Sequence, residues 1–284
     1  MSRTTVAAIN NFSASIDDKN NTLEICIAVA KLPSLKILIE AFVSFYCKVM
    51  AARIGIVVFP GSNCDRDVHH ILSNIIGIDV DFIWHTKERF TGYDAVIIPG
   101  GFAFGDRLRP GIIAAHSPIM REVKRMAKDG LPVLGICNGF QILVESGLLP
   151  GALMMNDSLC FVCKSTKVHV TNNKTPFTSQ FELKHTFNIP IAHGGGRYVA
   201  DSETLKELKR KNQIVLQYAR DNPNGSTDLI AAICNEDGNV MGMMPHPERA
   251  SERILTVDRS RNIRSDAITI FWSLVSNLKQ KAIL

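Results

Sequence analysis

The sequence predicts an α/β protein with three layers: a mostly parallel β-sheet and helices on both of its faces. From Arg53 onward, short apolar runs rich in β-branched residues alternate with helix-length segments. This alternation is typical of parallel sheets whose strands are joined by helical crossovers. Apolar residues make up 46% of the 284 residues and charged residues 21%, so the chain has enough apolar material for a sizeable core.

The predicted elements follow one another without an internal repeat or a low-complexity linker. The first strand, 54–59, is wholly apolar apart from Gly55 and ends at Pro60-Gly61-Ser62-Asn63. In the first half we expect helices over 64–76 and 117–129, strands over 79–84, 94–98 and 132–136, and a helix that starts near Cys137. Beyond residue 158 we expect strands over 161–170, 214–218, 229–234 and 240–244, a hairpin connection at 235–239, and a C-terminal helix over 263–281.

We expect one domain over 50–284 and an N-terminal extension over 1–49. The extension is either a helical appendage, with an amphipathic helix over 34–48, or a non-native start ahead of Met50. Residues 1–22 are mostly polar, so they do not resemble a secretory signal. The apolar stretch 23–50 lacks the roughly 18 uninterrupted apolar residues of a membrane span, because six positions interrupt it: Glu24, Lys31, Pro33, Lys36, Glu40 and Lys48.

The charge distribution and the number of cysteines indicate which classes of partner and which cellular compartment to expect. The net charge of +5 comes from interspersed residues of both signs, which gives no particular case for nucleic acid. Seven cysteines, an odd number without a spaced framework, indicate reduced thiols in the cytoplasm. Cys160 and Cys163 lie three apart on a predicted strand and therefore face opposite sides, so we expect no metal site there.

The segment Gly135-Ile136-Cys137-Asn138-Gly139 follows an apolar strand and opens a helix. Glycines on both sides of a reactive residue permit a sharp strand-to-helix turn that projects its side chain from the sheet. A helix N-terminus also favours the thiolate over the thiol. We therefore predict that Cys137 is a nucleophile and that the Asn138 N–H is an oxyanion donor.

A catalytic thiol needs a base, and the base needs an orienting group. Pro245 and Pro247 flank His246 in an extended segment, and residues two apart in such a segment project to the same side. Glu248 is therefore positioned to orient His246 toward Cys137. Paired glycines after the strand near residue 98 let backbone N–H groups approach a ligand, so Gly101 is a candidate second oxyanion donor.

These pieces resemble the class I (triad) glutamine amidotransferases, with Gln141 completing the Gly-x-Cys-x-Gly-x-Gln motif. Longer runs resemble one group of them, the glutaminase subunits of phosphoribosylformylglycinamidine synthase, over essentially 53–275. The runs that carry this resemblance are 58–65, 84–86, 100–102, 135–143, 147–151, 221–226 and 243–249.

The resemblance implies a flavodoxin-like fold, a Cys137–His246–Glu248 triad and glutamine contacts from Gly100, Gly101, Gln141 and His193. It implies hydrolysis of L-glutamine, with ammonia passed to a synthetase subunit that aminates formylglycinamide ribonucleotide. We expect no cofactor or metal on this chain, since it has no Walker-type loop. ATP and Mg²⁺ are expected on the synthetase, with a small bridging subunit beside it.

Two departures from the family pattern and three alternatives accompany this interpretation. The chain has Gly195 where the family shows His-Gly-Glu-Gly, and Pro110 where it shows Leu-Arg-Cys-Gly. The same triad could feed another acceptor, as in pyridoxal phosphate or histidine synthesis. The strand-to-helix turn around Cys137 could belong to a related hydrolase or chaperone, or the chain could be a non-catalytic interaction subunit.

Overall fold

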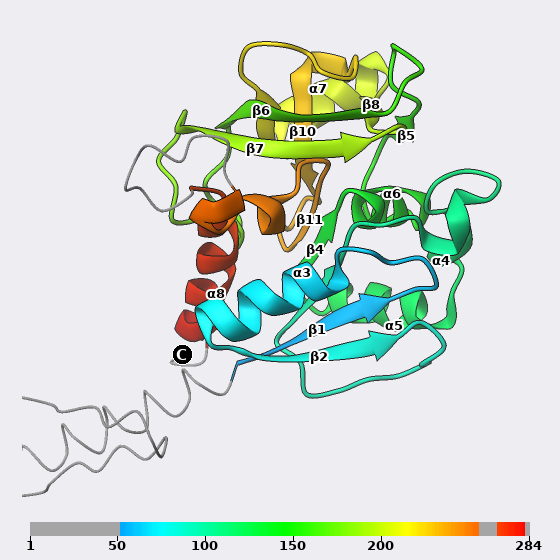
Figure 1. Ribbon diagram of the computed structural model, residues 1–284, viewed down its shortest axis with the longest axis vertical. Helices are drawn as coiled ribbons and strands as arrows, with labels where there is room; N and C mark the ends of the chain where they lie inside the picture. The colour runs from blue at the N-terminus through cyan, green and yellow to red at the C-terminus, as the bar shows by residue number, and fades with distance from the viewer. Residues whose placement is uncertain (1–51, 256–265, 282–284) are drawn as a thin grey trace, which may run out of the picture. The chain divides into compact units, whose positions relative to one another are not determined.

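A computed structural model describes residues 52–255 and 266–281. Its core element is a nine-stranded sheet with the order β2-β1-β3-β4-β11-β10-β9-β6-β7, and β5 and β8 form a separate two-stranded sheet (Figure 1). The strands are β1 (Arg53–Val58), β2 (Asp79–Trp84), β3 (Ala95–Ile98), β4 (Val133–Ile136), β5 (Ala152–Met154), β6 (Val162–Val170), β7 (Thr186–His193), β8 (Arg197–Val199), β9 (Ile214–Tyr218), β10 (Ile230–Cys234) and β11 (Val240–Met243).

The sheet has a parallel half and an antiparallel half. All neighbours from β2 to β11 in the sheet order are parallel, whereas β10, β9, β6 and β7 pair antiparallel to their neighbours. The parallel order β2-β1-β3-β4-β11 is the flavodoxin-like order, in which ligands bind beyond the carboxyl ends of the strands. The predicted α/β architecture, a mostly parallel sheet with flanking helices, is therefore confirmed, and a site is expected in the parallel half.

The helices connect the strands and cover the sheet (Figure 1). The longest are α5 and α8, and α3 continues as a π-helical segment, η1. The helical elements are α3 (Asp65–His69), η1 (His70–Ile76), η2 (Ala103–Asp106), α4 (Ile112–Ala115), α5 (Pro118–Lys128), α6 (Asn138–Glu145), α7 (Ser202–Arg210), η3 (Thr227–Leu229), η4 (Pro247–Ala250), η5 (Arg253–Leu255), η6 (Asp266–Ile268) and α8 (Thr269–Lys281).

Most predicted elements match the structure to within a few residues, and the differences have physical causes. Strand β7 was not predicted; Pro190 interrupts its pattern, which is tolerated because β7 lies at the sheet edge and pairs only with β6. Helix α7 was also missed, although Asp201 caps it by accepting a hydrogen bond from Thr204 N at 2.7 Å. The predicted helix over 34–48 and the extension 1–49 lie outside the described residues.

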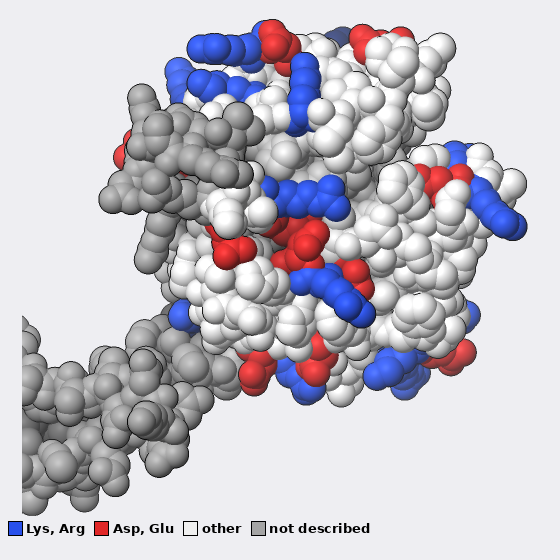
Figure 2. Space-filling model, viewed as in Figure 1, with Lys and Arg blue, Asp and Glu red and all other residues white. Residues whose placement is uncertain are grey.

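The surface carries charges of both signs. On the face shown in Figure 2, acidic and basic side chains lie next to one another above α3, and much of the surrounding surface is uncharged. Arg249 Nε approaches Asp67 Oδ2 at 3.7 Å, and His70 pairs with Glu252 at 3.0 Å. Within 52–255 and 266–281, no helix combines the length and apolar character needed to cross a bilayer.

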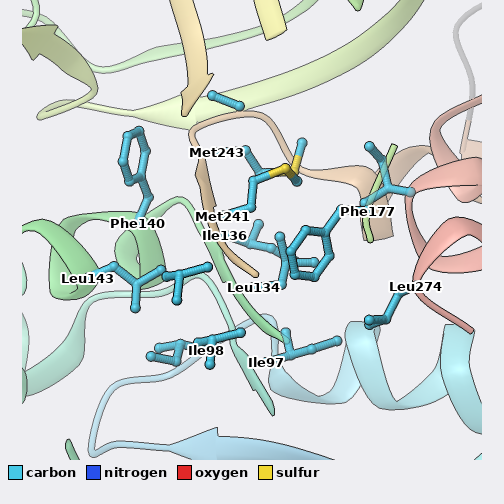
Figure 3. Close-up of a cluster of buried hydrophobic side chains, with 14 of the residues drawn as sticks. Ile97, Ile98, Leu134, Ile136, Phe140, Leu143, Phe177, Met241, Met243 and Leu274 are labelled. Carbon is cyan, nitrogen blue, oxygen red and sulfur yellow. The ribbon is translucent and has the colours of Figure 1, made fainter. Parts of the chain in front are cut away.

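The core fills both faces of the parallel strands (Figure 3). Phe140 and Leu143 of α6 lie on one side of β4 and β11, and Phe177 and Leu274 lie on the other. All four side chains are fully buried. The first turn of α6 is therefore fixed against the sheet, which holds the residue that precedes it in one position.

Candidate active site

The turn between β4 and α6 is strained at Cys137. Ile136 ends β4, Asn138 begins α6, and Cys137 alone forms the connection, with φ 51° and ψ −103°. A non-glycine residue with positive φ is costly and persists only when the surrounding structure enforces it. The Cys137 N–H donates to Met243 O at 2.7 Å, which ties the turn to β11. The sharp strand-to-helix turn predicted around Cys137 is present, and the Cys137 thiol lies at the N-terminus of α6.

His246 and Glu248 form a buried pair just beyond the end of β11. Nδ1 of His246 lies 2.6 Å from Oε1 of Glu248, and the two residues are 2% and 1% exposed. The His246 N–H donates to Pro190 O at 2.9 Å, so the edge strand β7 holds the backbone of the histidine. Burial lowers the pKa of His246, but the charges of Glu248 and Cys137 raise it well above its usual value.

The pair with Glu248 leaves one ring nitrogen of His246 open. Because Glu248 engages Nδ1, Nε2 is the nitrogen left for the reacting groups, and it has no hydrogen-bond partner among the described residues. Both side chains line one pocket. A buried imidazolium with a carboxylate on one nitrogen can donate a proton from the other.

Two backbone N–H groups are available beside the sulfur. The Asn138 N–H belongs to the first turn of α6 and has no acceptor within the helix. Gly101 faces Ser62 in a bridge whose hydrogen bonds run from Phe102 N to Gly61 O and from Asn63 N to Gly100 O. The Gly101 N–H takes no part in that pair of bonds and remains available.

Gly101 and its neighbour Gly100 are constrained to be glycine for different reasons. Gly101 has φ +148°, and a Cβ there would lie 2.7 Å from the backbone of Gly61 and Asn63. A Cβ on Gly100 would lie 2.8 Å from Cε1 of His246 and 3.1 Å from Sγ of Cys64. The close approach of this loop to the histidine therefore depends on the missing side chains.

The pocket brings together most of the residues singled out from the sequence. Cys137, His246, Gly101, Gln141 and His193 line it. Gly100 packs behind the histidine, Glu248 is buried, and the Asn138 side chain binds Gln141 Oε1 at 2.8 Å. Gln141 also donates to Gly195 O at 2.7 Å. The two departures from the family pattern meet here, since a Cβ on Gly195 would lie 3.5 Å from Pro110 Cγ.

His193 is a neutral hydrogen-bond acceptor toward the pocket. Asn156 uses Nδ2 to donate to two carbonyls and Oδ1 to accept the Gly196 N–H at 3.1 Å. Oδ1 is thus an acceptor, so Nδ1 of His193, at 3.0 Å, carries the proton. Burial and the nearby charge of His246 lower the pKa of His193 to about 4. Its Nε2 is a buried lone pair without a partner among the described residues.

Sequence reasoning assigned no role to Cys64, a second thiol beside the histidine. Its Sγ lies 3.9 Å from Nδ1 of His246 and 3.1 Å from Nη2 of Arg249. Burial raises the pKa of Cys64, although its contact with His246 lowers it in part. Cys64 lies in the run 58–65 that carries the family resemblance, but that run gives it no role, and its proximity to His246 is purely tertiary.

Cys64, His246 and Glu248 also offer sulfur, nitrogen and oxygen atoms within 4.8 Å of one another. Such a donor set would suit zinc. The 2.6 Å contact between Nδ1 and Oε1 is, however, a hydrogen bond, and two ligands of one ion must stand farther apart than that. The arrangement therefore suits orientation of the histidine better than metal binding.

Sequence reasoning also assigned no role to Asp106, which ends the short helical segment η2. It lines the pocket, and Oδ1 accepts a hydrogen bond from Asn138 Nδ2 at 3.3 Å. Burial raises the pKa of Asp106 to about 6, while the bond from Asn138 lowers it in part. Asp106 belongs to a loop without a recognisable motif.

Comparisons with known proteins agree with this geometry. A family model described as the CobB/CobQ-like glutamine amidotransferase domain matches residues 51–276. A chain in the structure of PurLQS from Thermotoga maritima is 44% identical over 81% of this chain and 100% of its own length, with a TM-score of 0.72.

Two more distant structures share the fold alone. A glutamine amidotransferase from Thermotoga maritima is 13% identical over 81% of this chain and 99% of its own, with a TM-score of 0.54. The glutaminase domain of Trypanosoma brucei CTPS, solved with acivicin, is 14% identical over 80% and 94%, with a TM-score of 0.51.

The fold and the pocket define an α/β protein with a cysteine–histidine–carboxylate site. With the family model covering most of its length, the chain belongs to the CobB/CobQ-like glutamine amidotransferase family.

Proposed function

We propose that this chain is the glutaminase subunit of a phosphoribosylformylglycinamidine synthase. It hydrolyses L-glutamine and passes ammonia to a synthetase subunit, which uses ATP and Mg²⁺ to convert formylglycinamide ribonucleotide to formylglycinamidine ribonucleotide. The observation that carries the proposal is the strained Cys137 at a helix N-terminus, in one pocket with the buried His246–Glu248 pair. The 44% identity to a chain of PurLQS supports this acceptor over others.

Cys137 is the better nucleophile of the two thiols in the pocket. It alone joins its strand to its helix, directly precedes the Asn138 N–H at the N-terminus of α6, and lines one pocket with Gly101 and His246. Cys64 approaches Nδ1, the nitrogen already bound to Glu248. A thiol on that side gains little from the histidine as a base.

The reaction follows from these positions. The thiolate of Cys137 attacks the side-chain amide carbon of glutamine, and the N–H groups of Gly101 and Asn138 stabilise the oxyanion. The His246 imidazolium protonates the departing nitrogen, so ammonia leaves and a γ-glutamyl thioester remains on Cys137. His246, now neutral, takes a proton from water, which attacks the thioester and releases glutamate and the thiolate.

His193 and Gln141 hold the substrate in this scheme. His193 lines the pocket together with Cys137 and His246, and its Nε2 lone pair is buried without a partner among the described residues. There it accepts a hydrogen bond from the amide NH₂ of glutamine. The Gln141 side chain lines the same pocket and is held in place by hydrogen bonds with Asn138 and Gly195.

Apolar side chains at the mouth of the pocket suit contact with the synthetase. Phe102 and Phe161 line the pocket although they are 46% and 54% exposed, and Met155, also half-exposed, adjoins Phe161 at Gly194. Ammonia released into water becomes ammonium and loses its nucleophilicity. A partner seated on this apolar rim would exclude water and receive the ammonia directly.

The test is glutamate release by the reconstituted complex of this chain with its synthetase and bridging subunits. Cys137→Ala is expected to lower the rate by about a thousandfold or more, while Cys160→Ala, which removes an exposed thiol, leaves it unchanged. Ammonium chloride should restore amination of formylglycinamide ribonucleotide by the Cys137→Ala complex. If Cys137→Ala releases as much glutamate as wild type, the enzyme proposal is wrong; if ammonium gives no amination, the acceptor is wrong.

A further inference from the structure

Asp106 is the one acidic side chain among the residues that line the pocket within the described chain. Its carboxylate has no Lys, Arg or His within ion-pair distance among the residues described, and its hydrogen-bond partner is the neutral amide of Asn138. Half-buried carboxylates are normally paired, because burial without a counter-charge is unfavourable. The Asp106 carboxylate is therefore available to form an ion pair with a cationic group of a bound ligand.

The loop that carries Asp106 is held in a costly conformation. Phe104, Asp106 and Leu108 all have positive φ, at 55°, 53° and 69°. The Asn138 side chain anchors this loop: Oδ1 accepts the Ala103 N–H at 3.0 Å, and Nδ2 donates to Asp106. Since Asn138 directly follows Cys137, the position of the carboxylate is fixed relative to the sulfur.

The two ends of the pocket differ in exposure. Cys137 and His246 are 6% and 2% exposed, whereas Asp106, which lines the same pocket, is only partly buried and so lies on its more open side. A glutamine whose amide carbon reaches Cys137 must leave its amino-acid end toward that side. Its α-ammonium group then needs an anionic acceptor, and the lining offers one.

We infer that Asp106 binds the α-ammonium group of the substrate and thereby restricts the site to the free amino acid. This inference rests on the proposed glutaminase function and adds a specificity determinant to it. The partner of the ion pair comes with the substrate, so the carboxylate stays unpaired in the free protein. The raised pKa of Asp106 is consistent with a charge that awaits its partner.

The experiment compares L-glutamine with glutaramate, which is glutamine without its amino group, as substrates of the reconstituted complex. The quantity measured is the ratio of kcat/KM for glutamine to kcat/KM for glutaramate. Asp106→Asn keeps the size and the acceptor oxygen toward Asn138 but removes the charge. This variant is expected to lower the ratio roughly ten- to hundredfold, mainly through the KM for glutamine.

Asp129→Asn is the matched control, because it removes the same charge from an exposed ion pair with Arg125 at the end of α5; its ratio should equal that of wild type. Asp106→Asn should also melt at or above the wild-type temperature, which excludes misfolding as the cause. An unchanged ratio in Asp106→Asn overturns the inference, whether both substrates lose activity or neither does. Failure of wild type to hydrolyse glutamine would instead overturn the proposed function.

Discussion

The β4–α6 turn and the β1–α3 turn each place a cysteine in the same pocket, but with different backbone geometry. Cys137 alone joins its strand to its helix and has a φ of 51°. Cys64 follows a longer loop after Val58, has a relaxed φ of −98°, and precedes an α-helix of five residues. Both thiols are buried near His246.

The proposed nucleophile and the second thiol therefore share a pocket with His246 but are carried by turns of different geometry. The tight turn places Cys137 at the N-terminus of α6, in the pocket that His246 and Gly101 also line. The relaxed turn packs Cys64 between Arg249 and the nitrogen that Glu248 occupies. We therefore assign Cys64 to the packing that holds the histidine in place, and the following predictions test that division.

Replacing each thiol by serine should give the largest contrast. Cys137→Ser is expected to lower glutamate release about a thousandfold or more, since a hydroxyl is not ionised at this site. Cys64→Ser should remain within about tenfold of wild type, because it changes only a packing contact of the histidine. Steady-state glutaminase assays on the two variants in the complex measure this; comparable losses would erase the distinction between the turns.

Glu248→Gln should show how far the open nitrogen of His246 depends on its partner. The charge of Glu248 raises the pKa of His246, so its loss lowers that pKa and weakens the thiolate–imidazolium pair. We expect kcat to fall about a hundredfold or more, with slower alkylation of Cys137 by iodoacetamide at neutral pH.

Glu252→Gln, in an exposed pair with His70, is the control and should alkylate at the wild-type rate. If Glu248→Gln alkylates as fast as wild type, the pair does not depend on this carboxylate.

Gly101→Ala tests the oxyanion donor proposed for the reaction at Cys137. A Cβ would displace the backbone at Gly61 and Asn63 and move the N–H, so kcat should fall about a hundredfold. Gly77→Ala is the control, because Gly77 also has positive φ but a Cβ there would meet nothing within 4 Å. It should cost about 1 kcal/mol of stability without changing kcat. Equal kcat losses in the two variants would assign the effect to backbone strain alone.

The smallest effect concerns Asp106, which Asn138 links to the Cys137 turn. The carboxyl pKa is raised from 3.8 to about 6 in the folded protein, so between these values the folded state binds more protons than the unfolded state. This group therefore makes stability fall as pH rises from about 4 to about 6. The melting temperature of Asp106→Asn relative to that of wild type should rise as pH increases over this window and should stay higher at neutral pH. A constant difference across the window would contradict the raised pKa.

Local sequence predicted the parallel half of the fold well. Strands β3, β4 and β11 are continuous apolar runs because both of their faces are buried. Glycines and prolines mark the turns between the strands. The antiparallel half was only partly predicted: the patterns of β6, β9 and β10 were visible in the sequence, but Pro190 concealed β7. Only the sheet order shows that β7 lies at an edge, where a missing N–H is tolerated.

The candidate site divides in the same way. The elbow around Cys137 and the segment 245–248 are fixed by residues next to one another, because steric restrictions at Gly and Pro act over one or two bonds. Asp106, Cys64 and Asn156 carry no such local signal. Their roles depend on which loops the sheet brings together, such as the Asn138 side chain reaching Ala103 and Asp106.

The sequence by itself therefore determined the fold class, the nucleophile turn and the histidine–glutamate segment, because backbone restrictions and apolar periodicity are properties of neighbouring residues. Only the tertiary structure decided which nitrogen of His246 remains open, that two cysteines share its pocket, and which carboxylate lines that pocket. Those outcomes depend on distances between segments far apart in the chain, which sheet order and packing set.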